Sequence, residues 1–492
     1  MIDLTTKIHD KFTLEFKVGF NTSKNQNLLE TNDFVMNTWI FVPNSLDINR
    51  EKYTKDDFYR DLKSDVRFIT PPYSLHDLAT DPTLLPNQAL AIECHETAAD
   101  DGDTTNLIHA LKMFCAIFKS ATRNASQDII RCGDAIRQID DSRRFIEDIT
   151  MVLHNFRKQR DELFTVAHDP KLEEAFDYAD EFMSNILEQY TYRLRDALRL
   201  GHPEEYSQSE DRFRHTLETE RAYRKRQGYL SVESNSESSN SRFVYRASLL
   251  KKFAESDLFL HSDKTKDTFL IEQILYSAAA GVAMIFATVA SFFFQQRYGN
   301  FTFPFLVALV VSYMFKDRLK DWLRLLFAKR VSGRIFDTKT VFHIKKKKIG
   351  WSKDSFDFIS CDKLIPEVLA QRQRDKLFEQ VSGKDEKVIL FRKKVRIWRS
   401  KLAKVSPFPL RGINDNIRFN ITEFVRKMDD PHIPLSGSWE DDGYAVIVGE
   451  KNYFLYFVFQ FVFEGRTEYK RLAVKCNKNG LFPLSNRTDG SC

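Results

Sequence analysis

An uninterrupted apolar stretch in the second half of the chain constrains the fold more than any other feature. Residues Ile274–Phe294 contain no Asp, Glu, His, Lys or Arg. At about 1.5 Å per residue, a helix of this length matches a hydrocarbon core of roughly 30 Å. Such a run is rare in soluble domains, where the alternative would be a helical hairpin buried in a large core. The sequence therefore predicts a membrane-spanning helix.

A second apolar stretch follows after a short polar interruption whose one charged residue is Arg297. Phe301–Phe315 is at the short end of what crosses a bilayer. Pro304 falls in its first turn, where the missing N–H would be unpaired anyway, and Lys316 can extend its ammonium group toward the headgroups. We therefore expect a two-helix transmembrane hairpin over residues 269–315 of a multi-pass membrane protein.

Basic side chains concentrate directly after this hairpin. Between Lys316 and Lys348 there are twelve Lys or Arg against three Asp, although the whole chain of 492 residues carries a net charge of only +5. Cytoplasmic flanks carry such an excess, whereas the loop between the two stretches has only Arg297. We expect both termini to be cytoplasmic and, in a bacterium, the hairpin to lie in the inner membrane. The first residues show no secretory signal.

The same basic segment is the predicted contact with the bilayer surface. The pattern of 319–327 separates apolar from charged side chains, as in an interfacial helix, and the lysine run at 345–348 could bind phosphates. Because the run follows a membrane exit, anionic lipid headgroups are favoured over nucleic acid, which is an unlikely partner. The residues expected to bind lipid are Lys316, Arg318, Lys320, Arg324, Lys345, Lys346, Lys347 and Lys348.

Small side chains recur along the first apolar stretch. Their steps of four residues create helix faces that another helix can approach closely. We expect these faces to pack the two predicted spans together, with self-association as the alternative use. The residues are Ser277, Gly281, Ala283, Ala287 and Ser291.

The remainder of the chain predicts an α+β protein. Alternating apolar residues indicate strands near 12–20, 32–42 and 387–398. An antiparallel meander is expected at 444–448, 453–463 and 468–476, and its middle strand is apolar on both faces and so central. A helix is expected where Ile417, Ile421, Phe424, Val425 and Met428 share one face.

A helical period replaces the strand period between about 106 and 226. Phe145, Ile149, Val152 and Phe156 share one face, and a second set runs from Leu172 to Leu194 in steps of three and four. These spacings predict an antiparallel bundle of three or four helices with seams of coiled-coil type.

The expected order is therefore a succession of separate regions. Because the serine-rich stretch is polar and of low complexity, we also expect residues 1 to about 230 to fold without the membrane. The regions are 1–103, mixed α/β; 104–230, helical bundle; 231–241, linker; 242–268, membrane-proximal helix; 269–315, transmembrane hairpin; 316–348, basic juxtamembrane segment; and 349–492, a cytoplasmic α+β domain with the meander.

The motifs of common catalytic chemistry are missing. His95 and Glu96 begin like a zincin motif, but Ala99 stands where the second His is required. No P-loop, dinucleotide-binding glycine pattern or nucleophile elbow occurs. The six cysteines form no C-x-x-C pair, which is typical of reduced thiols. We therefore expect no catalytic residue, metal or cofactor.

An acidic loop precedes the first long helical pattern. The carboxylates of Asp100, Asp101 and Asp103 could hold Mg²⁺ through oxygen ligands. Acidic residues before a helix also cap its N–H groups and interact favourably with its dipole, and this structural role is favoured.

These observations favour a membrane-anchored cytoplasmic adaptor, sensor or assembly platform without catalysis of its own, which binds a protein partner or itself. One alternative is an enzyme acting on a lipid or nucleotide, with a site dispersed in the sequence. Another is a small pore made by oligomerised hairpins. A transporter or proton relay is disfavoured, because neither apolar stretch contains Asp, Glu, His, Lys or Arg.

Overall fold

The structure is a computed structural model, and the chain forms two compact units. The first unit comprises Met1–Val66, His261–Val405 and Asn414–Cys492, and the second comprises Arg67–Leu260 and Ser406–Ile413. The structure describes residues 2–483 except 22–30, 99–103, 165–168, 202, 208, 235, 268, 300–301, 332–335, 345–346, 373–385, 405–407, 409, 411, 436–438, 441–442 and 445–446.

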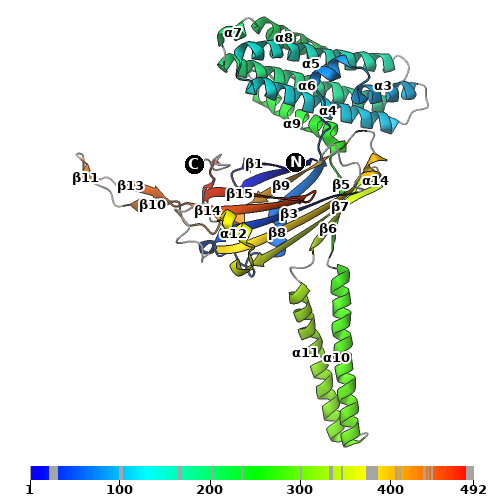
Figure 1. The fold of residues 1–492 in the computed structure, drawn as a ribbon, viewed down its shortest axis with the longest axis vertical. Helices are drawn as coiled ribbons and strands as arrows, with labels where there is room; N and C mark the ends of the chain where they lie inside the picture. Colours follow the sequence, from blue (N-terminus) through cyan, green and yellow to red (C-terminus); the bar gives the residue numbers. More distant parts are fainter. Residues whose placement is uncertain are drawn as a thin grey trace. The chain divides into compact units, whose positions relative to one another are not determined.

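The first unit is built on an antiparallel sheet, here called the large sheet, in which the described residues contribute eight strands (Figure 1). Its order is β16-β15-β14-β3-β8-β7-β6-β5. The strands are β3 Thr31–Pro43, β5 His261–Lys266, β6 Thr338–Ile344, β7 Lys347–Ile359, β8 Glu386–Trp398, β14 Tyr453–Phe463, β15 Arg466–Asn477 and β16 Gly480–Leu481.

Strands from both ends of the sequence share the large sheet. β3 lies between β8 and β14, with Thr38 opposite Phe391 on one side and Phe459 on the other. The buried run from Trp39 to Val42 requires this central place, because both faces of the strand are apolar there. The expected separation of 1–103 from 349–492 therefore does not describe the compact units, whereas the expected central position of β14 is observed.

A second sheet packs against the large one. Its order is β1-β2-β9-β4, with β1 Ile2–Asp10, β2 Thr13–Asn21, β9 Gly412–Asn420 and β4 Leu62–Phe68. Aromatic rings fill the space between the sheets: the ring centroid of Phe457 lies 5.2 Å from that of Phe16 and 6.1 Å from that of Phe419. These pairs make the interior of the first unit a densely aromatic sandwich core.

One expected helix is wrong. Ile413, Ile417 and Phe419 are buried at alternating positions of β9, and the helical part is only the four-residue α15 Thr422–Val425. The apparent helical spacing from Ile417 to Met428 arose because it ran across a strand, a turn and this short helix. Pairing with the sheet outweighs such a weak periodic signal.

The two helices that contain the long apolar stretches are inserted between neighbouring strands of the large sheet. α10 Phe269–Tyr298 follows β5, and α11 Phe303–Val331 precedes β6. β5 and β6 pair with each other, and Lys266 lies opposite Thr338 at the end nearest the helices in sequence. The expected membrane-proximal helix at 242–268 is therefore incorrect in its last part, which is the strand β5.

The second unit is a helical bundle around α6 Pro170–Gly201. This helix contacts α4 Thr104–Arg131, α5 Ala135–Phe164, α8 Glu210–Gln227 and α9 Glu237–Glu255. The predicted seam on α5 is buried, as is the predicted set on α6. Six consecutive residues of α6, Ala179–Ser184, are also buried, so the helix is covered on several sides and a coiled coil is not supported.

A buried polar cluster joins three helices of the bundle. Asp180, which is fully buried, accepts hydrogen bonds from Arg157 Nε at 2.8 Å, Tyr223 OH at 2.8 Å and Tyr229 OH at 3.0 Å. α9 joins the same bundle, because both Arg246 Nε and Nη2 donate to Glu181 on α6. These contacts explain why α9 packs on the bundle although it follows the serine-rich stretch.

Short elements complete the fold. A two-stranded ribbon of β10 and β13 carries exposed apolar side chains from both strands, including Ile433, Leu435, Ile447 and Val448. The remaining elements are α1 Lys55–Asp61, α2 Leu75–Thr80, α3 Leu85–Ala98, α7 Pro203–Ser207, α12 Pro366–Arg372, α14 Arg399–Ala403, β10 His432–Leu435, β11 Trp439–Glu440, β12 Gly443–Tyr444, β13 Ile447–Glu450 and the 3-10 helices η1 Asn44–Leu46, η2 Ser256–Leu258 and η3 Cys361–Lys363.

Candidate functional site

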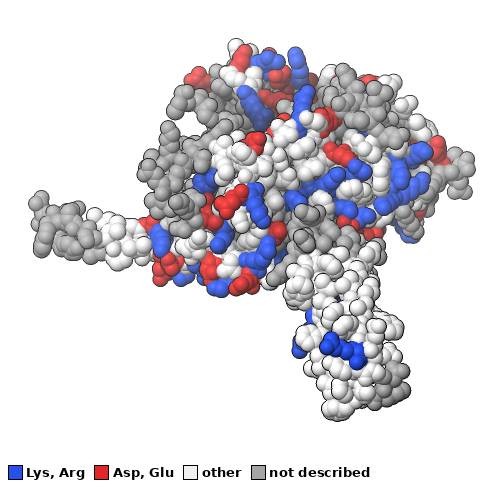
Figure 2. All heavy atoms as spheres, turned by 60° about the horizontal axis from the view of Figure 1, so that its bottom comes forward, with Lys and Arg blue, Asp and Glu red and all other residues white. Residues whose placement is uncertain are grey.

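α10 has the properties of a helix that meets lipid. Among the described residues, Glu272–Tyr298 is the one helical stretch that is long and apolar enough to cross a membrane, and 11% of its most apolar window is buried. Large apolar side chains point outward along its length, with Ile285 and Phe292 each 65% exposed. A helix in a soluble core would bury these groups. In Figure 2 uncharged side chains make up most of the visible surface of the protruding helices, with a few Lys or Arg side chains among them.

α11 does not meet the same criterion, so two spanning helices and a multi-pass protein are not confirmed. Its apolar part ends at Phe315, and the same helix then continues through Lys316, Asp317 and Arg318. Any window long enough to cross a bilayer therefore includes several charges. The expected interfacial segment at 319–327 is a direct continuation of this helix rather than a separate element.

The helices pack through a stripe of small residues. Ala279 and Ala283 on α10 are almost completely buried, as is Ser312 on α11. Of the predicted packing residues, Ala283 is buried, and Ala287 and Ser291 are half-buried on the same side of α10. Ser277 and Gly281 are exposed, and a Cβ added to Gly281 would meet nothing within 4 Å.

The predicted lipid-binding cations fall into two groups. On α11, Lys316 Nζ lies 3.6 Å from the ring centroid of Tyr313, and the Arg324 guanidinium lies 5.3 Å from that of Tyr276 on α10. Lys320 pairs with Asp317 of its own helix, and Arg318 is exposed. The charged half of α11 therefore runs antiparallel beside the first turns of α10.

The second group lies at the start of β7. Lys347 and Lys348 are exposed, and Lys348 Nζ is 5.5 Å from the ring centroid of Trp398. Lys345 and Lys346 lie outside the described residues. The structure thus separates the predicted cations between a helix and a sheet edge, and it gives them no single pocket among the residues described.

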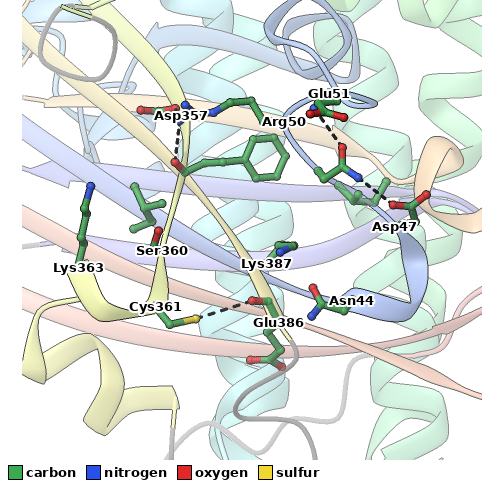
Figure 3. A pocket seen from close by; sticks show the side chains of 14 residues that line it. Asn44, Asp47, Arg50, Glu51, Asp357, Ser360, Cys361, Lys363, Glu386 and Lys387 are labelled. Atoms are coloured by element: carbon green, nitrogen blue, oxygen red, sulfur yellow. Dashed lines mark hydrogen bonds and ion pairs between the residues drawn. The ribbon is translucent and has the colours of Figure 1, made fainter. Parts of the chain in front are cut away.

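The first unit also contains a cavity of about 1070 Å³ between the segment after η1 and the ends of β7 and β8 (Figure 3). Arg50 crosses its rim, with Nη2 2.5 Å from Asp357 Oδ1 and 3.1 Å from the carbonyl oxygen of Phe358. Cys361 Sγ donates to the Glu386 carbonyl oxygen at 3.7 Å. Burial raises the pKa of the Cys361 thiol, with nearby carboxylates as a further cause, so the group is a poor nucleophile.

Some ionic groups of the cavity are engaged in ion pairs. Glu386 is held by Arg372 of α12 through contacts of 2.6 and 3.2 Å, and Arg50 is held by Asp357. No histidine lines the described wall. The cavity therefore has volume for a small molecule, and its described lining residues form no hydrogen-bonded pair of a nucleophile and a side-chain base.

Metal chemistry finds little support. The described residues contain no group of three or more His, Cys, Asp or Glu side chains that could hold an ion. Asp100, Asp101 and Asp103, considered above as oxygen ligands, lie outside the described residues. The sequence did not reveal the cavity, because its walls come from segments about three hundred residues apart whose pairing depends on sheet topology.

Known proteins offer no further assignment. No protein-family model matches the chain, and neither a curated protein nor a solved structure is significantly similar to it.

Proposed function

We propose that this chain is a membrane-anchored cytoplasmic adaptor, sensor or assembly platform without its own catalysis. The observation that carries the proposal is the outward exposure of large apolar side chains along α10, on the sides that α11 does not cover, because a soluble protein would have to cover them. The exposed apolar ribbon of β10 and β13 supports the binding of a protein partner.

In this proposal α10 and α11 enter the bilayer together as a two-helix hairpin. Phe303–Phe315 is about 20 Å long as a helix, so a crossing by α11 requires local thinning of the bilayer and extension of Lys316 toward the headgroups. The close packing at Ala279 and Ala283 supports joint insertion. Tyr276 and Arg324 would lie at the headgroup level, where an aromatic ring and a guanidinium are favoured.

The orientation follows from charge. The excess of Lys and Arg after α11 supports a cytoplasmic location for both ends of the hairpin and hence for both termini. Anionic headgroups would then meet Lys316, Arg318, Lys320 and Arg324 on one side and the lysine run at 345–348 on the other.

A topology experiment tests the anchor. Reporter fusions at residues 1 and 492 should both be active in the cytoplasm, and Arg297→Cys should react with a membrane-impermeant maleimide in intact cells. Wild-type protein is the control, because its six cysteines would all be inside. An outside reporter signal at either end contradicts the orientation. Failure of Arg297→Cys to react in intact cells, together with reaction after lysis, contradicts a full crossing.

A further inference from the structure

The outer face of the large sheet, which points away from the second sheet, is divided into two zones. One zone is apolar and buried, and α12 contributes Val368 to the cluster formed there with Trp39, Phe41 and Tyr456. The other zone includes Val35, Asn37 and Lys394, all of them half-buried. Its side chains come from the same strands but lie beyond the apolar cluster.

Three lysines form a row across this second zone. Lys339 on β6 lies directly opposite Lys353 on β7, and Lys353 lies directly opposite Lys394 on β8. Adjacent strands are about 4.8 Å apart, so the three side chains leave the same face as close neighbours. Like charges directly opposite each other destabilise a sheet. The row therefore costs stability unless an anion is present.

Neighbouring carboxylates neutralise only part of the positive charge of the lysine row. Lys353 Nζ lies 2.6 Å from Asp267 Oδ2. In the part of the chain that the structure describes, no carboxylate pairs with Lys339 or Lys394. In the next row, Arg396 is already held by Asp33, with Nε 2.7 Å from Oδ1. Excess positive charge thus remains along the lysine row.

We propose that the row formed by Lys339, Lys353 and Lys394 binds a phosphate-bearing anion. A phosphate group presents several charged oxygens, so it can accept hydrogen bonds from ammonium groups on two neighbouring strands at once. Trp351 lies beside the row, with Lys353 Nζ 5.6 Å and the Arg396 guanidinium 5.5 Å from its ring centroid. This packing limits the freedom of the central lysine.

The location favours a lipid headgroup as the source of the phosphate, a step that rests on the proposed membrane anchor. Lys339 is the second residue of β6, the strand that follows α11, and it lies opposite Thr265 on β5, the strand that precedes α10. Both strands are thus only a few residues from the helices. A soluble phosphate compound would use the same ammonium groups, so phosphate binding itself does not depend on the anchor.

The test uses the full-length protein in an uncharged detergent, with pyrophosphate as the probe. All five tryptophans belong to the first unit, so their fluorescence reports its thermal unfolding. Pyrophosphate should raise the unfolding midpoint of the wild type. Lys339→Gln and Lys394→Gln should each weaken pyrophosphate binding about fivefold, and each should match or exceed the wild-type midpoint without pyrophosphate because repulsion is relieved.

Lys63→Gln is the matched control, since Lys63 is an exposed lysine on β4 of the other sheet. Pyrophosphate should raise the unfolding midpoint of Lys63→Gln as much as that of the wild type. The proposal is overturned if pyrophosphate leaves the wild-type midpoint unchanged, or if the two row variants respond to it as fully as Lys63→Gln. A ligand-free midpoint well below the wild-type value would also overturn it, because the row would then be a structural contact.

A second arm identifies the source of the phosphate. The protein is reconstituted into vesicles of phosphatidylcholine alone or of phosphatidylcholine with phosphatidylglycerol, and the pyrophosphate response is measured again. Loss of the response with phosphatidylglycerol in the wild type supports occupation by headgroups. Persistence supports a soluble phosphate compound. The measurement in detergent tests phosphate binding by the three lysines even if the hairpin does not span the bilayer.

Discussion

Lys393 on β8 and Asp415 on β9 form an ion pair between the two sheets of the first unit, and each side chain is 2% exposed. Ser64 Oγ on β4 is hydrogen-bonded to both side chains. A buried pair of this kind contributes little when intact, but removing one partner leaves an uncompensated charge in the core. The two residues belong to different sheets, so the effect of removing one of them tests whether the sheets pack against each other as described.

Asp415→Asn should therefore destabilise the first unit strongly. We expect a loss of about 3 kcal/mol in the free energy of unfolding, because the buried Lys393 ammonium would lose the carboxylate that it contacts and keep only its interaction with Asp354 on β7. Denaturant unfolding followed by tryptophan fluorescence measures the change. Asp430→Asn is the control, since Asp430 pairs with Lys478 at 3.3 Å and is 84% exposed; it should cost less than about 1 kcal/mol. Equal effects of the two variants would rule out a buried pair.

Arg372 should not be replaceable by lysine. Its guanidinium donates two hydrogen bonds to Glu386 and lies 3.7 Å from the ring centroid of Tyr456. Lysine can supply the charge, but neither the paired donors nor the planar stacking. We expect Arg372→Lys to lower the free energy of unfolding by about 1–3 kcal/mol. Arg426→Lys on the exposed pair with Glu423 should change it by less than about 0.5 kcal/mol. A negligible effect of Arg372→Lys would mean that the paired hydrogen bonds to Glu386 and the stacking on Tyr456 do not stabilise the fold.

Acid should weaken the helical bundle through Asp257. Burial opposes the charged carboxylate, but the hydrogen bond from His109, at 2.5 Å, and the charge of Lys112 outweigh it and lower the pKa of Asp257 from 3.8. A group with a lowered folded pKa stabilises the protein above its unfolded pKa, and this contribution is lost as the pH falls through the folded pKa. The thermal midpoint should fall below about pH 4, and less steeply in Asp257→Asn. Thermal unfolding followed by circular dichroism at a series of pH values measures how the midpoint depends on pH in the wild type and in Asp257→Asn. An identical dependence in the two proteins would show that Asp257 is not the responsible group.

A fragment ending near residue 230 should aggregate, contrary to the expectation drawn from the linker. It would contain β3 without β8 and β14, leaving both strand edges unpaired and exposing Trp39, Ile40 and Phe41. A fragment of Arg67–Leu260 omits β3 and should instead be soluble and helical by circular dichroism. Size-exclusion chromatography compares the oligomeric states of the two fragments. A monomeric fragment of residues 1–230 would contradict the prediction, because β3 would then be stable in solution without β8 and β14.

The sequence predicted local elements better than their partners. The predicted strands β2, β3, β8 and β14 and the predicted buried faces of α5 and α6 are observed, because each apolar pattern reflects burial on one or both faces of a single element. The sheet order is invisible to periodicity, since Thr38 pairs with Phe391 and Phe459 across hundreds of residues. β5 was missed because all six of its residues are exposed and carry no apolar signal.

The site residues show the same limit. Composition identified the cations of α11 and the lysine run at 345–348, because charge density can be counted along the chain. Lys339, Lys353 and Lys394 are isolated lysines in sequence and become neighbours only through strand register. The cavity likewise joins Arg50 to Asp357 through tertiary structure alone.

The pairing of β5 with β6 determines how the first unit would respond to mechanical load. In the proposed membrane hairpin, a force that draws α10 and α11 apart in the bilayer plane would act first on the pair Lys266 and Thr338. The paired strands would then separate one residue pair at a time toward His261 and His343. A force that pulls both helices in the same direction loads the two strands together and leaves their mutual hydrogen bonds unstressed. The anchor would therefore yield to lateral separation at far lower force than to extraction along the membrane normal.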